Sequence, residues 1–213
     1  MRRHAPERGE ETRQRLLDAA ITLFAAEGFA RVTVRDICRA ADTNVAAVSY
    51  HFGDKFGLYM AVVRAAVDAM WDLNELAMQP ESATPEERLR HYIGTYVTKL
   101  VEFGGPASWI HRLMQHEMAE PTPAASWIVE NAIRPRLRYL AGVLSRLLHV
   151  PPTDERVRWC VVTIQAQCLS FLPNAIRARA LSDWPPITAD GIDAIVDYLM
   201  TYSLAGIRAM AEV

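Results

Sequence analysis

Apolar residues recur at every third or fourth position along most of this chain, which is the period of an α-helix. Glycine, proline and capping residues separate these stretches, and no segment alternates apolar and polar residues as a half-buried β-strand does. The long helices are expected at about residues 11–27, 58–76, 84–104, 107–119, 122–134, 136–148, 154–172 and 189–210. The pattern predicts an all-α fold.

Residues 33–55, TVRDICRAADTNVAAVSYHFGDK, contain two shorter helical stretches with a turn between them. Thr33 and Asp36 form the S/T-x-x-D pattern that starts a helix, because the hydroxyl accepts an amide N–H and the carboxylate reaches back. Asp42-Thr43-Asn44 supplies turn and cap residues before the second helix. The inward apolar positions are Val34, Ile37, Cys38 and Ala41, then Val45, Val48 and Phe52. This arrangement predicts a helix-turn-helix, whose second helix enters the major groove of DNA.

The outward face of that second helix carries small or amphipathic side chains. They are Ala46, Ala47, Ser49, Tyr50 and His51. A helix that approaches base edges and phosphates closely needs side chains of this kind. The stretch is therefore predicted to read DNA.

In this region the chain resembles the amino-terminal domain of the TetR family of transcriptional regulators. The matching residues are Ala19, Ala20, Phe24, Gly28, Phe29, Thr33, Ile37, Ala41, Val48, Tyr50, His51, Phe52, Lys55 and Leu58. Asp42-Thr43-Asn44 departs from the usual Gly-Val-Ser, and Ala46 replaces a frequent glycine. The stretch AAVSYHFGDKFGLYMAVV, with the later HRLMQHEMAEPT and IRPRL, is most similar to regulators of the CecR type.

The resemblance implies a three-helix DNA-binding domain at residues 1–57 and a connecting helix at 58–78. A larger helical domain at 79–213 would bind an effector and dimerise; Gln79-Pro80-Glu81-Ser82 is a linker signal at its start. The implied function is a sequence-specific transcriptional regulator, a repressor that a small-molecule effector releases from its operator. An activator or a ligand-independent DNA-binding protein stays open as an alternative.

The DNA contacts implied by the resemblance fall into two groups. Those expected to touch the DNA backbone are Thr33, Tyr50, His51 and Lys55. Those expected to read bases are Arg35, Asn44, Ala46 and Ala47, with Ser49 beside them. Arg35 matches a position that reaches a guanine in some family members, and an arginine can bind O6 and N7 of guanine together.

The last two long helices carry more apolar residues than one face of each requires. They include Val157, Cys160, Val161, Ile164, Cys168 and Phe171, then Ile192, Ile195, Val196, Leu199, Tyr202 and Ile207. Ordinary core packing explains part of this surface. The resemblance implies that the same pair of helices forms a four-helix bundle in a homodimer. A dimer would present two recognition helices to a palindromic operator in double-stranded DNA.

Polar residues on otherwise apolar helices mark a candidate effector pocket in the second domain. They are Trp109, Arg112, Gln115, His116 and Gln165. A mostly apolar pocket uses a few such groups to orient a ligand. The other interpretation stays open: Gln115 faces solvent, and the tryptophan is a packing anchor.

Charge and cysteine content limit the possible partners and the compartment. Lysine and arginine (23) nearly balance aspartate and glutamate (25), so charge alone does not bind nucleic acid. A basic edge near the start, either a solvated tail or a DNA-touching arm, consists of Arg2, Arg3, Arg8, Arg13 and Arg15. Three cysteines leave an odd count, which favours a reducing compartment. We find neither a signal peptide nor an uncharged stretch of about 18 residues and expect a cytoplasmic protein without membrane contact.

Enzyme chemistry has little support in the sequence. His111 and His116 diverge by about 140° on a helix, so they cannot bind one metal ion as an i, i+4 pair does. There is no G-x-S-x-G, no phosphate-binding glycine loop and no C-x-x-C. Cys160 and Cys168 are about 12 Å apart along one helix, too far for a disulfide. We expect no catalytic residue, metal or cofactor; a helical enzyme or heme-type sensor is the opposing hypothesis, which an absorbance spectrum would test.

Overall fold

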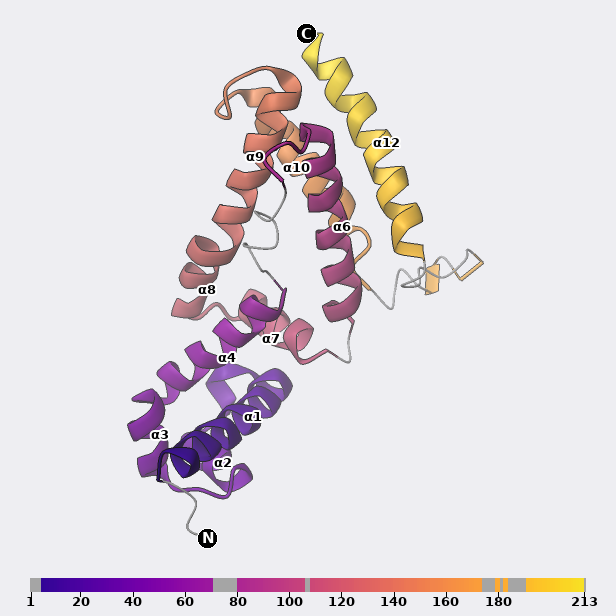
Figure 1. The fold of residues 1–213 in the computed structure, drawn as a ribbon. Helices are drawn as coiled ribbons and strands as arrows, with labels where there is room; N and C mark the ends of the chain where they lie inside the picture. The colour runs from indigo at the N-terminus through magenta and orange to yellow at the C-terminus, as the bar shows by residue number, and fades with distance from the viewer. Residues whose placement is uncertain are drawn as a thin grey trace. The chain divides into compact units, whose positions relative to one another are not determined.

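The structure, a computed structural model, describes residues 5–70, 80–105, 108–173, 179–180, 182–183 and 191–212. The regular secondary structure in those residues is helical, and none of them lies in a strand (Figure 1). The predicted all-α fold is confirmed. Packing divides the chain into a first unit, residues 1–70 with 107–128, and a second unit, residues 71–106 with 129–213.

The first unit is built around its first helix. It contains α1 (Ala5–Arg31), α2 (Val34–Ala40), α3 (Val45–Phe52), α4 (Lys55–Met70), α7 (Trp109–Ala119) and α8 (Pro123–Ile128). Helix α1 packs against α2, α3, α4 and α7, while α8 packs against α4. Leu16, Ala20 and Phe24 form the buried stripe of α1, and the Phe24 ring meets Tyr59 edge-on with centroids 5.0 Å apart. The helix-turn-helix thus rests on an aromatic core.

Gly28 interrupts the helical path of α1. Its φ of 79° and ψ of 167° break the helical path, after which helix continues to Arg31. A Cβ at this position would lie 3.0 Å from Nδ1 of His116. Glycine is therefore required twice here, by the positive φ and by the close approach of α7. The break agrees with the expected end of the first long helix at about residue 27.

The packing units and the predicted domains divide the chain differently. Residues 107–128, placed by the sequence in the second domain, pack with the first unit through α7 and α8. The connecting helix is described as α4 up to Met70, and its expected continuation to residue 78 lies outside the described residues. The functional division at residues 57 and 79 stays a prediction.

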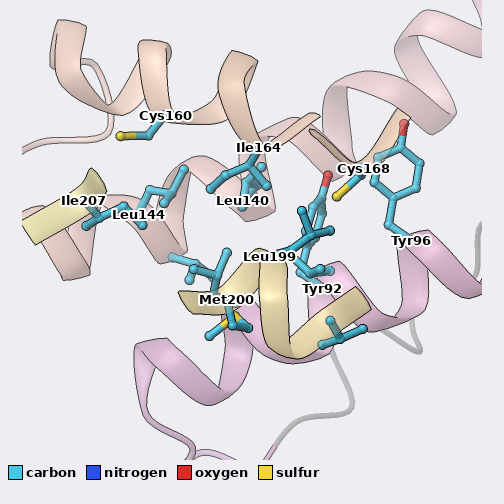
Figure 2. Packing of buried hydrophobic residues seen from close by; sticks show 14 of the residues in the cluster. Tyr92, Tyr96, Leu140, Leu144, Cys160, Ile164, Cys168, Leu199, Met200 and Ile207 are labelled. Atoms are coloured by element: carbon cyan, nitrogen blue, oxygen red, sulfur yellow. The ribbon is translucent and has the colours of Figure 1, made fainter. Parts of the chain in front are cut away.

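The second unit has an apolar core shared by four helices. It contains α6 (Pro85–Phe103), a π-helical turn η1 (Val129–Ile133), α9 (Arg134–Leu148), α10 (Glu155–Leu169) and α12 (Ile192–Ala211). Helix α6 packs against α9, α10 and α12, and α9 and α10 also pack against each other. Leucine, isoleucine, valine and methionine side chains from these helices interdigitate along the core (Figure 2).

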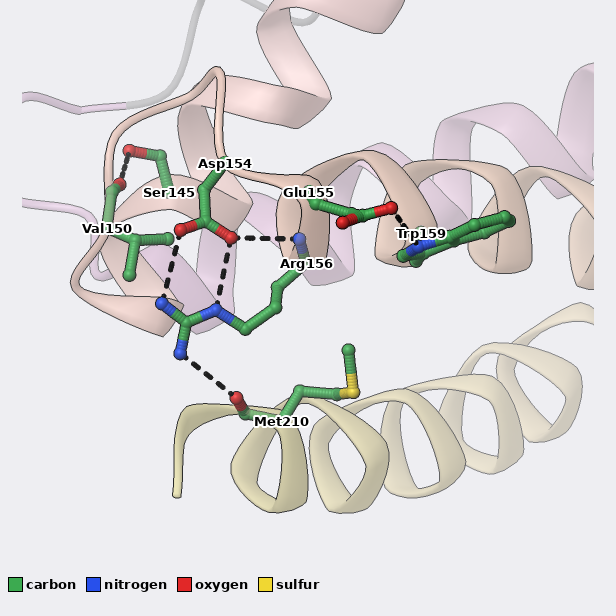
Figure 3. A network of polar contacts seen from close by, with 7 residues as sticks. All are labelled: Ser145, Val150, Asp154, Glu155, Arg156, Trp159 and Met210. Carbon is green, nitrogen blue, oxygen red and sulfur yellow. Dashed lines mark hydrogen bonds and ion pairs between the residues drawn. The ribbon is translucent and has the colours of Figure 1, made fainter. Parts of the chain in front are cut away.

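Local signals set several helix ends in this unit. Thr84 and Glu87 form a capping box at the start of α6. Pro135 lies in the first turn of α9, directly after η1; the wider π turn accommodates a residue that has no N–H to donate. Asp154 caps α10 and binds the Arg156 guanidinium, which also donates to the Met210 carbonyl of α12 (Figure 3). These hydrogen bonds from Arg156 hold the pKa of Asp154 below its usual value.

Two further expectations concern the cysteines and membrane-spanning segments. Cys38, Cys160 and Cys168 are buried and free of disulfides. Within the described ranges, no helix has the length and apolar character that spanning a bilayer requires.

Candidate nucleic-acid interface and effector residues

The start of α2 is held by a complete capping box. The Asp36 amide donates to Oγ1 of Thr33 at 3.2 Å, and the Thr33 hydroxyl and amide donate to Oδ2 of Asp36 at 2.6 and 3.1 Å. These hydrogen bonds from Thr33 lower the pKa of Asp36. Because both donors of Thr33 point to Asp36, a phosphate has to compete with this carboxylate. The backbone contact of Thr33 stays a prediction.

The turn between α2 and α3 is held from α1. Nη1 of Arg15 donates to the Ala41 carbonyl at 3.2 Å and to the Asp42 carbonyl at 3.4 Å. Asp42 has a φ of 48°, which an aspartate tolerates in a tight turn. The sequence assigned Arg15 to a basic edge, whereas its described contacts place it against the turn. Arg15 therefore holds the turn that joins α2 and α3.

Of the other arginines in the predicted basic edge, only Arg13 has described side-chain contacts. The Arg13 guanidinium lies 5.4 Å from the Phe52 ring centroid and pairs with Glu10 at 3.4 Å. Arg2 and Arg3 lie outside the described residues, and nothing is described of the Arg8 side chain. A DNA-touching arm stays a prediction for those three.

Helix α3 starts at Asn44 and presents an exposed face. Oδ1 of Asn44 accepts the Ala47 amide at 3.0 Å, and Asn44 is exposed. Val48 is buried, while Ala46, Ser49 and Tyr50 are exposed. The exposed fraction of Tyr50 is 83%. Ala47 and His51 are half-buried. The predicted outward face is largely as expected.

Val45 corrects one detail of that face. It was expected to point inward, but it is 49% exposed. As the first residue after the cap, it lies at the end of the recognition helix that approaches bases. Its methyl groups are suited to contact a thymine methyl, as the adjacent alanines are. The position of Val45 directly after the Asn44 cap was the sequence feature that could have indicated its exposure.

Arg35 and Lys55 flank the reading helices. Arg35 is exposed in the first turn of α2. The Lys55 amino group lies 4.3 Å from the Phe29 ring centroid, and partial burial lowers its pKa. The aromatic ring holds the lysine beside the start of α4, close in sequence to the exposed Tyr50. Their assigned DNA contacts stay predictions.

The predicted effector residues belong to different helices. Trp109, Arg112, Gln115 and His116 lie on α7 in the first unit, and Gln165 lies on α10 in the second. Arg112 and Gln115 are exposed, while the other three are half-buried. His116 packs against Gly28 of α1. The solvent-facing interpretation fits Gln115, and the role of all five in binding an effector stays a prediction.

Glu117, which follows His116 on α7, is a buried carboxylate. It is 5% exposed and accepts hydrogen bonds from the Tyr59 hydroxyl at 2.6 Å and the Thr122 amide at 2.8 Å. The Thr122 hydroxyl lies 2.9 Å from the same carboxylate. Burial and the bond to Glu117 raise the pKa of Tyr59. Ile110 and Leu113 precede Glu117 at helical spacing, so an acidic residue on an apolar stripe was the available signal.

A cavity of about 400 Å³ adjoins this hydrogen-bonded group. Its lining includes Gly28, Phe29, Tyr59, His116 and Thr122. Helix α7 is therefore joined to α1 through His116 and to α4 through Glu117. Within the first unit, α7 therefore contacts two helices that themselves pack against the helix-turn-helix.

Gln165 belongs to a polar cluster inside the second unit. Its Oε1 accepts Nη2 of Arg136 at 3.2 Å, and its Nε2 donates to the Tyr92 hydroxyl. Arg136 is 7% exposed, and its guanidinium lies 4.2 Å from the Tyr96 ring centroid. Arg136 was not among the predicted site residues, although Leu140 and Leu144 follow it on the buried stripe of α9.

The outer faces of α10 and α12 carry large apolar side chains. The exposed ones are Trp159, Val162, Leu169, Tyr198 and Tyr202. A cavity of about 160 Å³ lies between the two helices, with Trp159, Cys160 and Tyr202 in its lining. Exposed apolar surface of this kind marks an interaction site.

Family comparisons agree with both halves of this arrangement. The profile of the tetR family of bacterial regulatory proteins matches residues 16–62. The profile of the C-terminal domain of the HTH-type transcriptional dual regulator CecR matches residues 85–207.

Individual relatives match over different lengths. The regulator BetI of Paraburkholderia xenovorans is 30% identical over 89% of this chain and 80% of its own length. CecR of Shigella flexneri is 23% identical over 77% of each chain. YttP of Bacillus subtilis is 43% identical over 22% of this chain, which spans only 23% of YttP. The chain spans no more than 31% of two further curated relatives, whose matches are similarly short.

A solved structure supports the fold. A tetR-family regulatory protein from Rhodococcus RHA1 superposes with a TM-score of 0.62 at 20% identity, covering 92% of this chain and 96% of its own. At that identity the likeness concerns the fold alone.

Proposed function

This chain belongs to the TetR family of bacterial transcriptional regulators, with a second domain of the CecR type, and we propose that it is a dimeric repressor which a small molecule releases from operator DNA. The exposed face of α3, held between the Asn44 cap and the buried Val48, is the observation that carries DNA binding. The family consists of regulators, and we assign the chain no catalytic reaction. Its place of action is the cytoplasm, where chromosomal operators are found.

Selection from random DNA tests the DNA-binding part. We expect a palindromic motif whose half-sites are about 34–36 Å apart, or a multiple of that spacing. Lys55→Ala should weaken operator and random DNA together and lower the salt slope by about one unit, because backbone contacts carry no sequence information. Lys99→Ala, in the second unit, is the matched control. An unchanged salt slope in the Lys55 variant contradicts its assignment, and a selection without any motif contradicts the proposed function.

Two arguments support a homodimer: the exposed apolar surface of α10 and α12, and the affinity that operator binding requires. One short recognition helix reads few base pairs, so tight binding requires a second half-site. The exposed apolar residues of α10 and α12 offer a surface that a second copy of the chain can bury. Sedimentation of Tyr202→Arg should show monomers with weakened operator binding, because a charge is placed at the centre of that surface. Gln14→Arg, on the exposed side of α1, should leave the dimer intact.

Release by an effector requires the ligand to prefer one arrangement of the protein over another. Coupling is reciprocal, so operator DNA must weaken effector binding by the same factor. Helix α7 is suited to transmit the change, since Glu117 holds Tyr59 of α4. Candidate effector contacts are Trp109, Arg112, Gln115 and His116 on α7 and Gln165 on α10.

Effector contacts and helix braces are separable by mutation. Substituting Arg112 or Gln115 by alanine should raise the effector concentration needed for release while operator affinity without effector stays nearly unchanged. Melting temperature, operator affinity and effector response are measured on the same variants. Parallel loss of all three identifies a packing role and removes that residue from the effector site.

A further inference from the structure

The cavity of about 400 Å³ in the first unit is large enough for a small molecule. Its volume lies within the range of ligand sites in proteins, about 300–1,000 Å³. Three parts of the unit contribute to its lining: the end of α1, the Tyr59 ring of α4, and α7 with the segment that follows it. A ligand in this cavity therefore contacts α1 and α4, the two helices on which the helix-turn-helix packs.

Aromatic rings form the apolar part of the lining. The centroids of the Phe29 and Tyr59 rings lie 4.8 Å apart, with the ring planes inclined by 51°. Tyr59 is buried in the core of the unit, while Phe29 is half-buried. Pro121 and Pro123 add the aliphatic surface of their rings. A flat aromatic compound is suited to pack on such a wall.

The polar part of the lining favours a positive charge. Glu120 is exposed at the end of α7, where its backbone amide donates to the His116 carbonyl at 2.9 Å. The last turn of α1 also borders the cavity, so the carbonyl ends of two helices meet there. Such ends carry partial negative charge. No lysine or arginine is present among the described lining residues.

The Phe29 ring already attracts an ammonium group. The amino group of Lys55 lies 4.3 Å from its centroid, a distance typical of a cation–π interaction. Lys55 itself does not line the cavity, whereas Phe29 does. A cation in the cavity therefore approaches the same ring and the same lysine, to which we assign a contact with the DNA backbone.

We propose that this cavity is the effector site and that it binds an aromatic primary amine, whose ring packs on Phe29 and Tyr59 and whose ammonium group binds the Glu120 carboxylate. The proposal rests on the function proposed above, because it names the class of that effector and places His116, one of its candidate contacts, in the lining. An ammonium group beside Phe29 repels Lys55 from the ring, because like charges repel. Effector binding thus weakens the DNA contact assigned to Lys55.

Matched ligands test the charge requirement. Benzylamine, phenethylamine and tryptamine, which are protonated at neutral pH, are compared by calorimetry with benzyl alcohol, phenethyl alcohol and tryptophol on the full-length protein. We expect at least one amine to bind about fivefold more tightly than its alcohol, because the ion pair and the cation–π contact require the charge. Equal binding of amines and alcohols, or no binding of any amine, overturns the proposal.

Variants in the lining test the residues. Glu120→Gln should weaken the amine by about threefold or more and leave the alcohol unchanged, because only the charged group pairs with the carboxylate. Asp68→Asn is the matched control, since it removes one negative charge from an exposed position on α4 outside the lining. Phe29→Leu should weaken both ligands, the amine more than the alcohol. If Phe29→Leu does not fold, the exposed Glu120 still decides. Amine affinity unchanged in Glu120→Gln overturns the site.

Lys55 tests the coupling to DNA. Lys55→Ala should bind the amine about threefold more tightly, because it removes the competing charge at Phe29. In the unchanged protein the bound amine should lower the salt slope of operator binding by about one unit, as Lys55→Ala does without a ligand. An amine that binds through Glu120 yet leaves operator affinity unchanged overturns the effector role of the cavity.

The operator arm also separates this proposal from the proposed function. Release of operator DNA by other compounds, while no amine binds, supports the regulator and overturns the site. A selection from random DNA that returns no motif contradicts the proposed function, whereas amine binding that depends on Glu120 still supports the ligand site.

Discussion

Glu117 in the first unit and Arg136 in the second are both buried charged side chains on the apolar stripe of a helix. Glu117 is surrounded by donors of its own chain, the Tyr59 hydroxyl and the amide and hydroxyl of Thr122. The described contacts of Arg136 include a neutral amide and an aromatic face. Burial alone therefore does not determine how much a charged side chain contributes to stability. The chemistry of its neighbours matters as well, because a buried charge stabilises the fold most where hydrogen bonds and opposite charge compensate it.

The largest effect is expected where the chain satisfies its own charge. Glu117→Ala leaves the Tyr59 hydroxyl and Thr122 without their acceptor and opens a cavity, which should cost about 3 kcal/mol of stability. Chemical denaturation of the full-length protein measures it. Glu120→Ala, three residues along and exposed, should change stability little. Similar losses of stability in both variants would contradict the stabilising role assigned to Glu117.

Arg35 represents the opposite case, an exposed charge available to a partner. Arg35→Ala should leave the melting temperature unchanged and reduce discrimination at one base pair of each half-site by about 2 kcal/mol, since the bidentate contact to guanine is lost. Operator selection with the variant gives the answer. A motif identical to that of the unchanged protein places Arg35 at a phosphate or at the surface.

Asn44 combines both roles in one side chain, and two substitutions separate them. Asn44→Ala removes the cap and should cost about 1 kcal/mol of stability. Asn44→Asp retains the capping oxygen but loses the N–H donors, so stability should hold while operator affinity falls. If the aspartate variant binds operator normally, Asn44 is a cap alone.

Arg136 should contribute less to stability than Glu117 does. Arg136→Met removes the cost of burying a guanidinium and keeps most of its volume, so a change below about 1 kcal/mol is expected. Denaturation beside Glu117→Ala makes the comparison direct. A loss of stability as large as that of Glu117→Ala would show that Arg136 stabilises the fold as strongly as Glu117 does.

Asp154 should give the smallest effect, because the carboxylate lies at the surface. Its hydrogen bonds to Arg156 lower its pKa from 3.8 in the folded state, so its contribution to stability is present above that value. The contribution is lost as the pH falls through the lower folded pKa. Asp154→Asn should therefore flatten the acid side of a melting-temperature profile slightly, with no change in its pH-dependence near neutrality. A variant profile identical to that of the unchanged protein below pH 3.8 contradicts the assignment.

Helix ends and the reading helices could be predicted from the sequence because their causes are local. Thr33 with Asp36 and Thr84 with Glu87 satisfy backbone groups within one turn, so residue type and spacing suffice. The helix-turn-helix and the exposure of Tyr50 follow from the same short-range periodicity. The family resemblance rested on those residues, and both family profiles confirm it.

Long-range packing decided the rest. Nothing within a few residues of Arg15 indicates that its guanidinium holds a turn formed by Ala41 and Asp42. Residues 107–128 have the same helical pattern whichever part of the chain they pack on, and only the fit of His116 against Gly28 shows that α7 lies on α1.

The sequence by itself determined that the chain is helical, where several of its helices are capped and where its helix-turn-helix lies, because periodicity and capping act over a few residues. Only the tertiary structure decided that Glu117 meets Tyr59 and that Arg136 meets Gln165 and Tyr96, because these contacts join helices far apart along the chain. A charged residue on an apolar stripe marks the position in the sequence. What it faces across the helix interface determines how much it contributes to stability.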